Sequence, residues 1–302
     1  MNKKMKILVE ASGCLTAGYL IKYIQKSGYI CVGTDVCEDC FGKYLADEFY
    51  SVPFASDENS PNFLKQLVID KKIDMVIPTL DDGLLNWANM KEELAENGVV
   101  VATSSVETLK VFLDKWETYK FFDSNGIPTP KTSLSQDYPL VKPRLGRGGS
   151  GIQITNAPVN MEGNISQELL SGTEYTIDVL CDMDGTPVYI VPRIRIGVKD
   201  GKATGGQVVK NEKIEDGIKR ICSAIKFQGP INVQCFITDA GSVSFTEINP
   251  RFGGGSVLGM AATENWMPLL VDMFINGQEI KPAADIKYGL KMGRYYDEVF
   301  YF

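Results

Sequence analysis

Apolar strand-like runs alternate with helical patterns through the first third of the chain, and this alternation constrains the fold most. The runs predict strands at residues 7–9, 29–33, 74–78 and 99–102. Between the first two, Leu15, Tyr19 and Tyr23 recur at helical spacing. Strands that alternate with helices favour a parallel sheet with helices on its faces.

The turn after the first strand does not carry a dinucleotide fingerprint. Residues 11–18 read ASGCLTAG, which lacks the G-x-G-x-x-G spacing, so NAD is disfavoured. Ligands of open α/β sheets bind beyond the carboxyl ends of the strands, which makes Ser12, Gly13 and Asp81 candidate substrate contacts. Ordinary loop and helix-capping roles are the alternative for all three residues.

A predicted β-hairpin at residues 233–249 carries oxygen ligands. Its strands flank a turn at 239–241. Residues two apart on a strand share a face, so Glu247 and Asn249 point together, and Gln234 on the partner strand is able to join them. Such an all-oxygen set suits Mg²⁺, which usually completes its shell with phosphate and water oxygens.

Cations that suit a phosphoryl group lie before and within a glycine-rich loop and beyond the hairpin. A strand delivers Lys142, and residues 146–151 read GRGGSG, with Arg147 adding charge. Backbone N–H groups of such a loop wrap an anion, which selects Gly148, Gly149 and Ser150; a flexible hairpin tip is the alternative. Arg251 follows Pro250, and a guanidinium beside a magnesium site is what phosphoryl transfer requires.

Three other cations have two interpretations each. Arg193 and Arg195 share a face of one predicted strand, either as a solvated edge or as a grip on phosphate and carboxylate groups, which we favour. Lys115 follows a helix cap at Asp114, where a cation opposes the helix dipole. A role for the Lys115 charge outside its own helix is therefore favoured over simple solvation.

A strand break at Gly172 predicts a hinge. The segment 165–181 contains a short strand, this break, and a long alternating strand. The hinge backbone is suited to meet a planar base, and Glu174 to accept hydrogen bonds from ribose hydroxyls.

Composition excludes several classes of chemistry. The chain of 302 residues contains no histidine, so catalytic triads with histidine and histidine zinc sites are absent. The net charge of −7 disfavours a nucleic-acid partner.

Neither a membrane span nor a signal peptide is indicated, so we expect a cytoplasmic protein. Most of the seven cysteines lie in apolar runs and suit buried thiols; Cys37 and Cys40 form one C-x-x-C pair, for which a redox role stays open.

The ordered set of motifs resembles the ATP-grasp superfamily, and most closely its small carbamoyl-phosphate-synthase-like carboxylate–amine ligases. The set reads Val-Lys-Pro, a glycine loop, Gln-Glu-Leu-Leu with a following Gly-x-Glu, Asn-Val-Gln, and Glu-Ile-Asn-Pro-Arg. The resemblance implies an α/β parallel-sheet pre-ATP-grasp domain at 1–105 and a two-lobed α+β ATP-grasp domain. Its small lobe with the lid would span 106–166, and its C-terminal lobe with the metal site 167–302.

The resemblance also implies roles for individual residues. Lys115 and Lys142 would bind the ATP phosphates under a lid formed by residues 146–151. The backbone of Glu168 and Leu170 would hold adenine, and Glu174 ribose. The implied metal ligands are Glu247, Asn249 and, more weakly, Gln234, where relatives often carry an acid. Candidate catalytic residues are Arg251, Lys142 and Arg195, and Arg193 and Arg195 would also contact substrate.

The implied activity is an ADP-forming ligation of a carboxylate to an amine, with ATP and Mg²⁺ or Mn²⁺. One alternative is phosphorylation of bicarbonate in the manner of carbamoyl phosphate synthase; another is a regulator that binds nucleotide without catalysis. The chain carries one ATP-grasp unit, so we do not expect a complete carbamoyl phosphate synthase. The implied partners are small-molecule acids and amines, without nucleic acid or membrane, and a homodimer is one open assembly.

Overall fold

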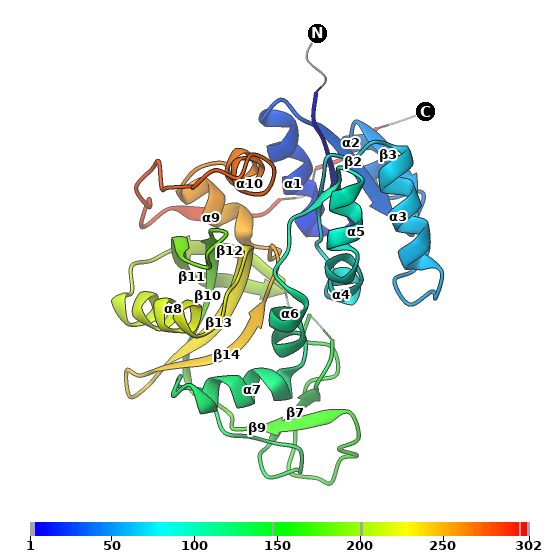
Figure 1. Ribbon diagram of the computed structural model, residues 1–302. Coiled ribbons are helices and arrows are strands. Elements are labelled where there is room, and N and C mark those ends of the chain that lie inside the picture. Colours follow the sequence, from blue (N-terminus) through cyan, green and yellow to red (C-terminus); the bar gives the residue numbers. More distant parts are fainter. Residues whose placement is uncertain (1–3, 147, 200–201, 296, 301–302) are drawn as a thin grey trace.

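The chain folds around three sheets that follow one another in sequence. A computed structural model describes residues 4–146, 148–199, 202–295 and 297–300. Figure 1 shows the first sheet with its helices in blue and cyan, the second at the far end of the molecule, and the third between them. Within the described residues, no helix is long and apolar enough to cross a membrane.

The N-terminal sheet is parallel throughout, as the alternating pattern predicts. Its strand order is β3-β2-β1-β4-β5. The strands are β1 (Lys6–Val9), β2 (Ile30–Asp35), β3 (Glu48–Ser51), β4 (Met75–Ile77) and β5 (Val100–Val101). The edge strand β3 was not expected, because its side chains are only half buried and its sequence has no apolar run.

Helices cover both faces of this sheet. They are α1 (Leu15–Lys26), α2 (Phe41–Leu45), α3 (Ser60–Asp70), α4 (Asp81–Asn89) and α5 (Lys91–Glu96). Ile7 and Val9 of β1 point to the face that α1 covers, and Leu8 points to the opposite face with Val68 of α3. The α4 helix begins directly beyond β4, so Asp81 stands at the carboxyl edge of the sheet.

The small antiparallel sheet forms the lobe that carries the glycine-rich loop. Its order is β6-β9-β7-β8. The strands are β6 (Thr132–Ser133), β7 (Leu140–Pro143), β8 (Gln153–Ile154) and β9 (Asn164–Gln167). The loop joins β7 to β8 and therefore lies at one end of this lobe.

The large antiparallel sheet carries the predicted hairpin at its edge. Its order is β14-β13-β10-β11-β12-β15. The strands are β10 (Gly172–Cys181), β11 (Pro187–Lys199), β12 (Lys202–Val208), β13 (Gly229–Thr238), β14 (Val243–Asn249) and β15 (Lys291–Gly293). Helices α6 (Val106–Phe112), α7 (Lys115–Ser124) and α8 (Glu212–Ala224) supply the core on one side, and α9 (Ser256–Ala262) and α10 (Trp266–Phe274) on the other.

The N-terminal domain and the C-terminal lobe share a continuous core. One apolar cluster contains Val9 of β1, Leu20 of α1, Val191 of β11 and Trp266 of α10. In Figure 1, α1 accordingly lies beside α9 and α10. Burial of this shared apolar surface fixes the position of the N-terminal domain relative to the C-terminal lobe, which allows side chains from both to form one site.

The predicted domain boundaries remain a prediction. The boundary at 105/106 falls between β5 and α6, and the boundary at 166/167 falls inside β9. Phe112 of α6 and Phe122 of α7 pack into the core of the large sheet, although both helices were assigned to the small lobe. Packing therefore links the helical connection to the C-terminal lobe.

Candidate active site

The predicted metal ligands lie on one face of the β13–β14 hairpin. Gln234 is the cross-strand partner of Glu247, and Asn232 is the partner of Asn249. Ile248, between the two candidate ligands, is buried in the core of the large sheet, so its neighbours point the other way. Glu247 is half buried and Asn249 is buried.

The donor set of this hairpin fits a hard divalent cation that also binds phosphate. No cluster of three or more acidic, cysteine or histidine side chains suited to a metal occurs among the described residues. The set consists of one carboxylate, on Glu247, and the amide oxygens of Asn249 and Gln234. Mg²⁺ is commonly held by one or two carboxylates and takes its other ligands from substrate phosphates and water.

Arg251 lies beside the hairpin end and is held by an acidic residue of the other domain. Its Nε donates to Asp81 Oδ1 at 2.6 Å and its Nη2 to Asp81 Oδ2 at 2.7 Å. Nη2 also donates to Asn249 Oδ1 at 3.1 Å, and Nη1 to the Phe252 carbonyl at 3.1 Å. Burial alone would lower the pKa of Arg251, but the carboxylate of Asp81 raises it, so the guanidinium stays charged.

Lys142 reaches the same region from the small lobe. The side chain is buried, and its Nζ donates to Gln167 Oε1 at 2.8 Å. Burial lowers the pKa of Lys142 to about 8; the Glu247 carboxylate acts in the opposite direction, and Lys115 adds to the lowering. Lys142 is therefore close enough to Glu247 and to Lys115 for each of these charges to act on it.

Lys115 contacts the glycine-rich loop. Its Nζ donates to the Gly146 carbonyl at 2.8 Å, and its backbone N–H to the Arg144 carbonyl at 3.1 Å. Arg144 in turn pairs with Asp114, the cap of α7, at 2.5 Å. Gly148, Gly149 and Ser150 are exposed; Arg147 lies outside the described residues. The two glycines have φ of 68° and 73°, a conformation that favours residues without a Cβ.

The predicted adenine hinge follows β9. The backbone N–H of Glu168 donates to the Lys131 carbonyl at 2.9 Å, and Leu170 is half buried. Gly172 has φ of 126°, and a Cβ there would lie 2.2 Å from the Ile237 carbonyl oxygen. Only glycine fits this position, which accounts for the strand break seen in the sequence.

Glu174 and Arg195 are paired with each other. Arg195 Nη1 lies 3.2 and 3.1 Å from the two carboxylate oxygens of Glu174, and both side chains are half exposed. The predicted ribose acceptor and one predicted catalytic cation therefore neighbour each other on adjacent strands. Their predicted contacts with ribose and substrate stay predictions.

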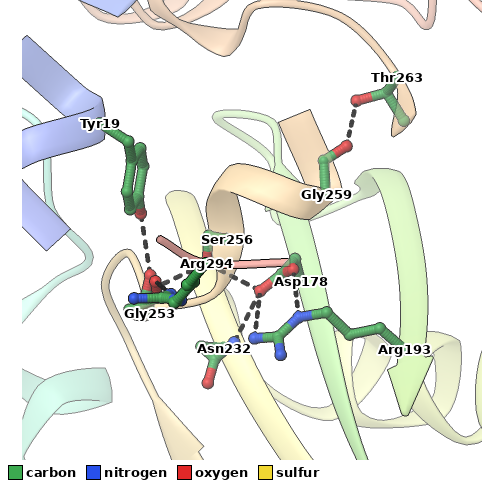
Figure 2. Close-up of polar contacts among 10 residues, drawn as sticks. Tyr19, Asp178, Arg193, Asn232, Gly253, Ser256, Gly259, Thr263 and Arg294 are labelled. Carbon is green, nitrogen blue, oxygen red and sulfur yellow. Dashed lines mark hydrogen bonds and ion pairs between the residues drawn. The ribbon is translucent and has the colours of Figure 1, made fainter. Parts of the chain in front are cut away.

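Arg193 lies in a buried polar cluster behind the glycine turn at 253–255. Its Nε donates to Asp178 Oδ2 at 2.8 Å. Oδ1 of the same carboxylate accepts from Asn232 Nδ2 at 2.7 Å and from Ser256 Oγ at 2.7 Å (Figure 2). Arg193 is 5% exposed, so the structure shows it as a support of the turn; the predicted direct contact with substrate stays a prediction.

Sequence reasoning did not select several residues of this region. Asp178 stands between Ile177 and Val179 in a buried strand, and an isolated acid there was a usable signal for a paired cation. Tyr19, whose hydroxyl donates to the Gly253 carbonyl at 2.9 Å, carried no comparable signal. Arg294 carried none either, because it lies far from every motif in the sequence.

Ser12 and Gly13 pack against the loop after β2. Ser12 is fully buried, and its Oγ lies 3.7 Å from Cys40 Sγ. The Gly13 N–H donates to Asp35 Oδ2 at 2.8 Å. Cys37 is exposed and Cys40 buried, and both are free thiols.

Family models match both parts of the chain. Residues 112–255 match a model described as an ATP-grasp domain, and residues 7–102 match the PylC-like N-terminal domain. One relative is the carbamoyl-phosphate synthase of Methanobrevibacter smithii, 28% identical over 179 residues, which cover 52% of this chain and 47% of the relative. The chain thus spans about half the length of that relative.

Solved structures show the same fold. The N5-carboxyaminoimidazole synthetase of Staphylococcus aureus complexed with ADP superposes with a TM-score of 0.75 at 19% identity and covers 97% of this chain and 83% of that one. An L-amino acid ligase from Bacillus licheniformis gives a TM-score of 0.71 at 17% identity, with coverages of 90% and 75%. Residues 112–255 therefore belong to the ATP-grasp domain family, and they follow a PylC-like N-terminal domain with a parallel sheet.

Proposed function

We propose that the protein is an ADP-forming ligase that activates a carboxylate with ATP and joins it to an amine. The observation that carries the proposal is that Lys142 of the small lobe meets Glu247 and Arg251, which lie at the end of the β13–β14 hairpin. Lys142 senses the charge of Glu247, and Arg251 bonds the side chain of Asn249, two residues from Glu247. Opposite charges that meet between lobes suit a polyphosphate with a metal ion.

The nucleotide would lie between the small lobe and the hairpin. Lys115 and Lys142 would meet its phosphates, and backbone N–H groups of Gly148, Gly149 and Ser150 would cover them from the loop. The chain segment from Glu168 to Leu170 would border adenine, with Glu174 at the ribose. Because Lys115 already bonds the Gly146 carbonyl, its position is coupled to that of the loop.

Glu247, Asn249 and Gln234 would hold Mg²⁺. When bound there, the ion would neutralise charge on the phosphate oxygens. Arg251 is oriented by Asp81, and four hydrogen bonds to described residues use four of its N–H donors. A guanidinium has five N–H donors, so one on Nη1 has no hydrogen bond within the described part of the chain and would meet a phosphoryl oxygen while the other donors hold the group in place.

The proposed reaction has two displacements. A carboxylate oxygen attacks the γ-phosphorus of ATP, the bond from phosphorus to the β,γ-bridging oxygen breaks, and ADP leaves with an acyl phosphate formed. The amine nitrogen then attacks the acyl carbon, the carbon–oxygen bond to phosphate breaks, and the amine proton is released. Preorganised cations stabilise the charge that develops on the transferring phosphoryl group.

The proposed role of the glycine-rich loop is to exclude water from the site. An acyl phosphate hydrolyses when water enters, so a closed loop protects the intermediate until the amine arrives. The exposed glycines of the loop permit such a movement, since they tolerate backbone conformations that other residues do not.

A second candidate activity uses bicarbonate as the acid. It is favoured by the relative named carbamoyl-phosphate synthase. A regulator without catalysis is disfavoured, because Glu247, Asn249, Arg251 and Lys142 are all present. We further propose that the protein acts on small molecules without a nucleic-acid partner; a homodimer stays a prediction.

The deciding experiment combines ADP release with mass analysis of the product. A panel of acids, including bicarbonate, is paired with a panel of amines in the presence of MgATP. ADP release that requires both partners, with an amide as product, supports the ligase. ADP release with bicarbonate and a carboxylated or carbamoyl product supports the second candidate. Both activities are contradicted if the protein binds nucleotide but no pair causes ADP release, and if Arg251→Lys binds nucleotide as well as the wild type does.

A further inference from the structure

Arg294 is a cation of the glycine turn that the proposed reaction does not use. It follows β15 and lies in the polar cluster of Figure 2, and its Nη2 donates to the Gly254 carbonyl. Its Nε is buried and has no hydrogen-bond partner among the described residues. Buried donors in folded proteins nearly always have an acceptor, so an unpaired one in a candidate site calls for an explanation.

The charge of Arg294 is also unmatched within the described part of the chain, where it forms no ion pair. The nearby carboxylate, Asp178, is committed to Arg193, with which it forms the 2.8 Å ion pair. The remaining oxygen of Asp178 accepts from Asn232 and Ser256. Burial lowers the pKa of Arg294, and the charge of Arg193 lowers it further. The guanidinium groups of Arg193 and Arg294 thus lie close enough for their charges to interact, and the Asp178 carboxylate pairs with Arg193.

In the turn at 253–255, two glycines are closely packed against other side chains, whereas Gly254 is not. A Cβ on Gly253 would lie 2.7 Å from Asn232 Cγ, and a Cβ on Gly255 2.5 Å from Arg193 Nη2. A Cβ on Gly254 would meet only Thr16 Oγ1, at 3.9 Å. Space of about one side-chain group therefore exists between Gly254 and the first turn of α1.

The walls of this space are suited to an anion. Thr16 contributes a hydroxyl from the first turn of α1, which contains no acidic residue. The N-terminal end of a helix carries partial positive charge that favours anions. Arg294 adds a full positive charge, and its planar guanidinium matches the geometry of a carboxylate.

We propose that Arg294, with Thr16 and the open face of Gly254, binds a carboxylate of the acid substrate. The site lies at the junction of the N-terminal domain and the C-terminal lobe, where Thr16 of α1 faces Gly254. The assignment of the carboxylate to the acid substrate rests on the proposed function, whereas the existence of the anion site does not. The site would favour acids that carry a second anionic group, because Arg251 is directed at the reacting end.

The test measures carboxylate binding directly and does not depend on turnover. Succinate is titrated calorimetrically into the full chain, with uncharged succinamide as the comparison, with and without MgADP. We expect succinate to bind and succinamide not to bind. Arg294→Gln should weaken succinate binding roughly 10- to 100-fold, the scale of losing hydrogen bonds to a charged partner. Lys291→Gln is the matched control, because Lys291 is an exposed cation of the preceding strand β15, and it should bind as the wild type does.

Further variants separate the site from a structural role of Arg294. Arg294→Lys keeps the charge without the planar fork and should bind with intermediate affinity. If Arg294→Gln does not fold, Thr16→Val replaces it and should weaken binding several-fold. Succinate that does not bind the wild-type chain, or that binds Arg294→Gln or Thr16→Val as tightly as wild type, overturns the proposal.

The outcomes also distinguish this site from the proposed function. If succinate binding depends on Arg294 but no acid and amine cause ADP release, the anion site is supported and the proposed ligase function is refuted. If Arg294→Gln leaves the KM of the ligase for its acid unchanged, the proposed function stands and the anion site is refuted.

Discussion

Asp81 and Arg251 form a largely buried bidentate ion pair between the N-terminal domain and the end of the β13–β14 hairpin. The two contacts are 2.6 and 2.7 Å long, and both side chains are 13% exposed. The pair joins the carboxyl edge of the parallel sheet to the predicted phosphoryl-transfer centre. The orientation of Arg251 is therefore set by a residue 170 positions away in sequence.

Loss of Asp81 should destabilise the fold. Asp81→Asn leaves the Arg251 guanidinium buried without its anion, and breaking a buried pair on one side costs about 3 kcal/mol or more. Urea unfolding should show this loss, whereas Asp239→Asn, at the exposed hairpin turn, should unfold like the wild type. Equal stability of Asp81→Asn and wild type would show that the pair contributes nothing to domain docking.

Arg251→Lys should lower turnover about 10²- to 10³-fold, the scale of losing a donor to the transition state. A lysine keeps the charge opposite Asp81 but cannot bridge Asp81, Asn249 and a phosphoryl oxygen at once. Steady-state kinetics on the pair found by ADP release should show KM for ATP nearly unchanged. Arg220→Lys, which alters an exposed arginine of α8, is the control; a similar loss in both variants would remove Arg251 from the mechanism.

Lys142 makes the stability of the ligand-free protein depend on pH. Its pKa is about 8 in the folded chain, below the ordinary 10.5, so the folded state binds fewer protons than the unfolded state between these values. The unfolding free energy should therefore rise as the pH increases from 8 to 10.5, by about 3 kcal/mol for a shift of this size. In Lys142→Met this contribution should vanish, which denaturant titrations across the pH range will show.

The same lysine predicts proton uptake when nucleotide binds. Phosphate oxygens near Lys142 favour its charged form and raise its pKa. At pH 8.5, MgADP binding should thus take up a fraction of a proton, measured by calorimetry in buffers of different ionisation enthalpy. Lys142→Met should abolish the uptake, and Lys131→Met, an exposed lysine of the same lobe, should retain it. Uptake that persists without Lys142 would assign the proton to another group.

Neighbouring glycines of the turn should respond differently to substitution. Gly255→Ala places a Cβ against the Arg193 guanidinium and should destabilise the fold by about 1–3 kcal/mol, the range for overpacking. Gly254→Ala meets open space towards Thr16 and should unfold near the wild-type temperature. Thermal unfolding of the two variants checks this contrast; equal losses would mean that the turn, rather than its contact with Arg193, limits stability.

Patterns within single elements allowed a large part of the fold to be predicted. The parallel sheet followed from apolar runs alternating with helical spacing, and it is observed with all its strand pairs parallel. Glu247 and Asn249 were expected on the face opposite Ile248, and the structure buries Ile248 in the core. Such patterns succeed because the period of a strand fixes the direction of each side chain locally.

The partners of the charged residues were decided by tertiary structure. The sequence predicted that Arg193 and Arg195 share one face of a strand. It could not show that Arg193 pairs with the buried Asp178 and that Arg195 pairs with Glu174. It selected Asp81 and Arg251 separately, as substrate and phosphate contacts, and missed Arg294. Local periodicity determines which way a side chain points, whereas its partner depends on how distant elements pack around the shared core, and no local pattern encodes that packing.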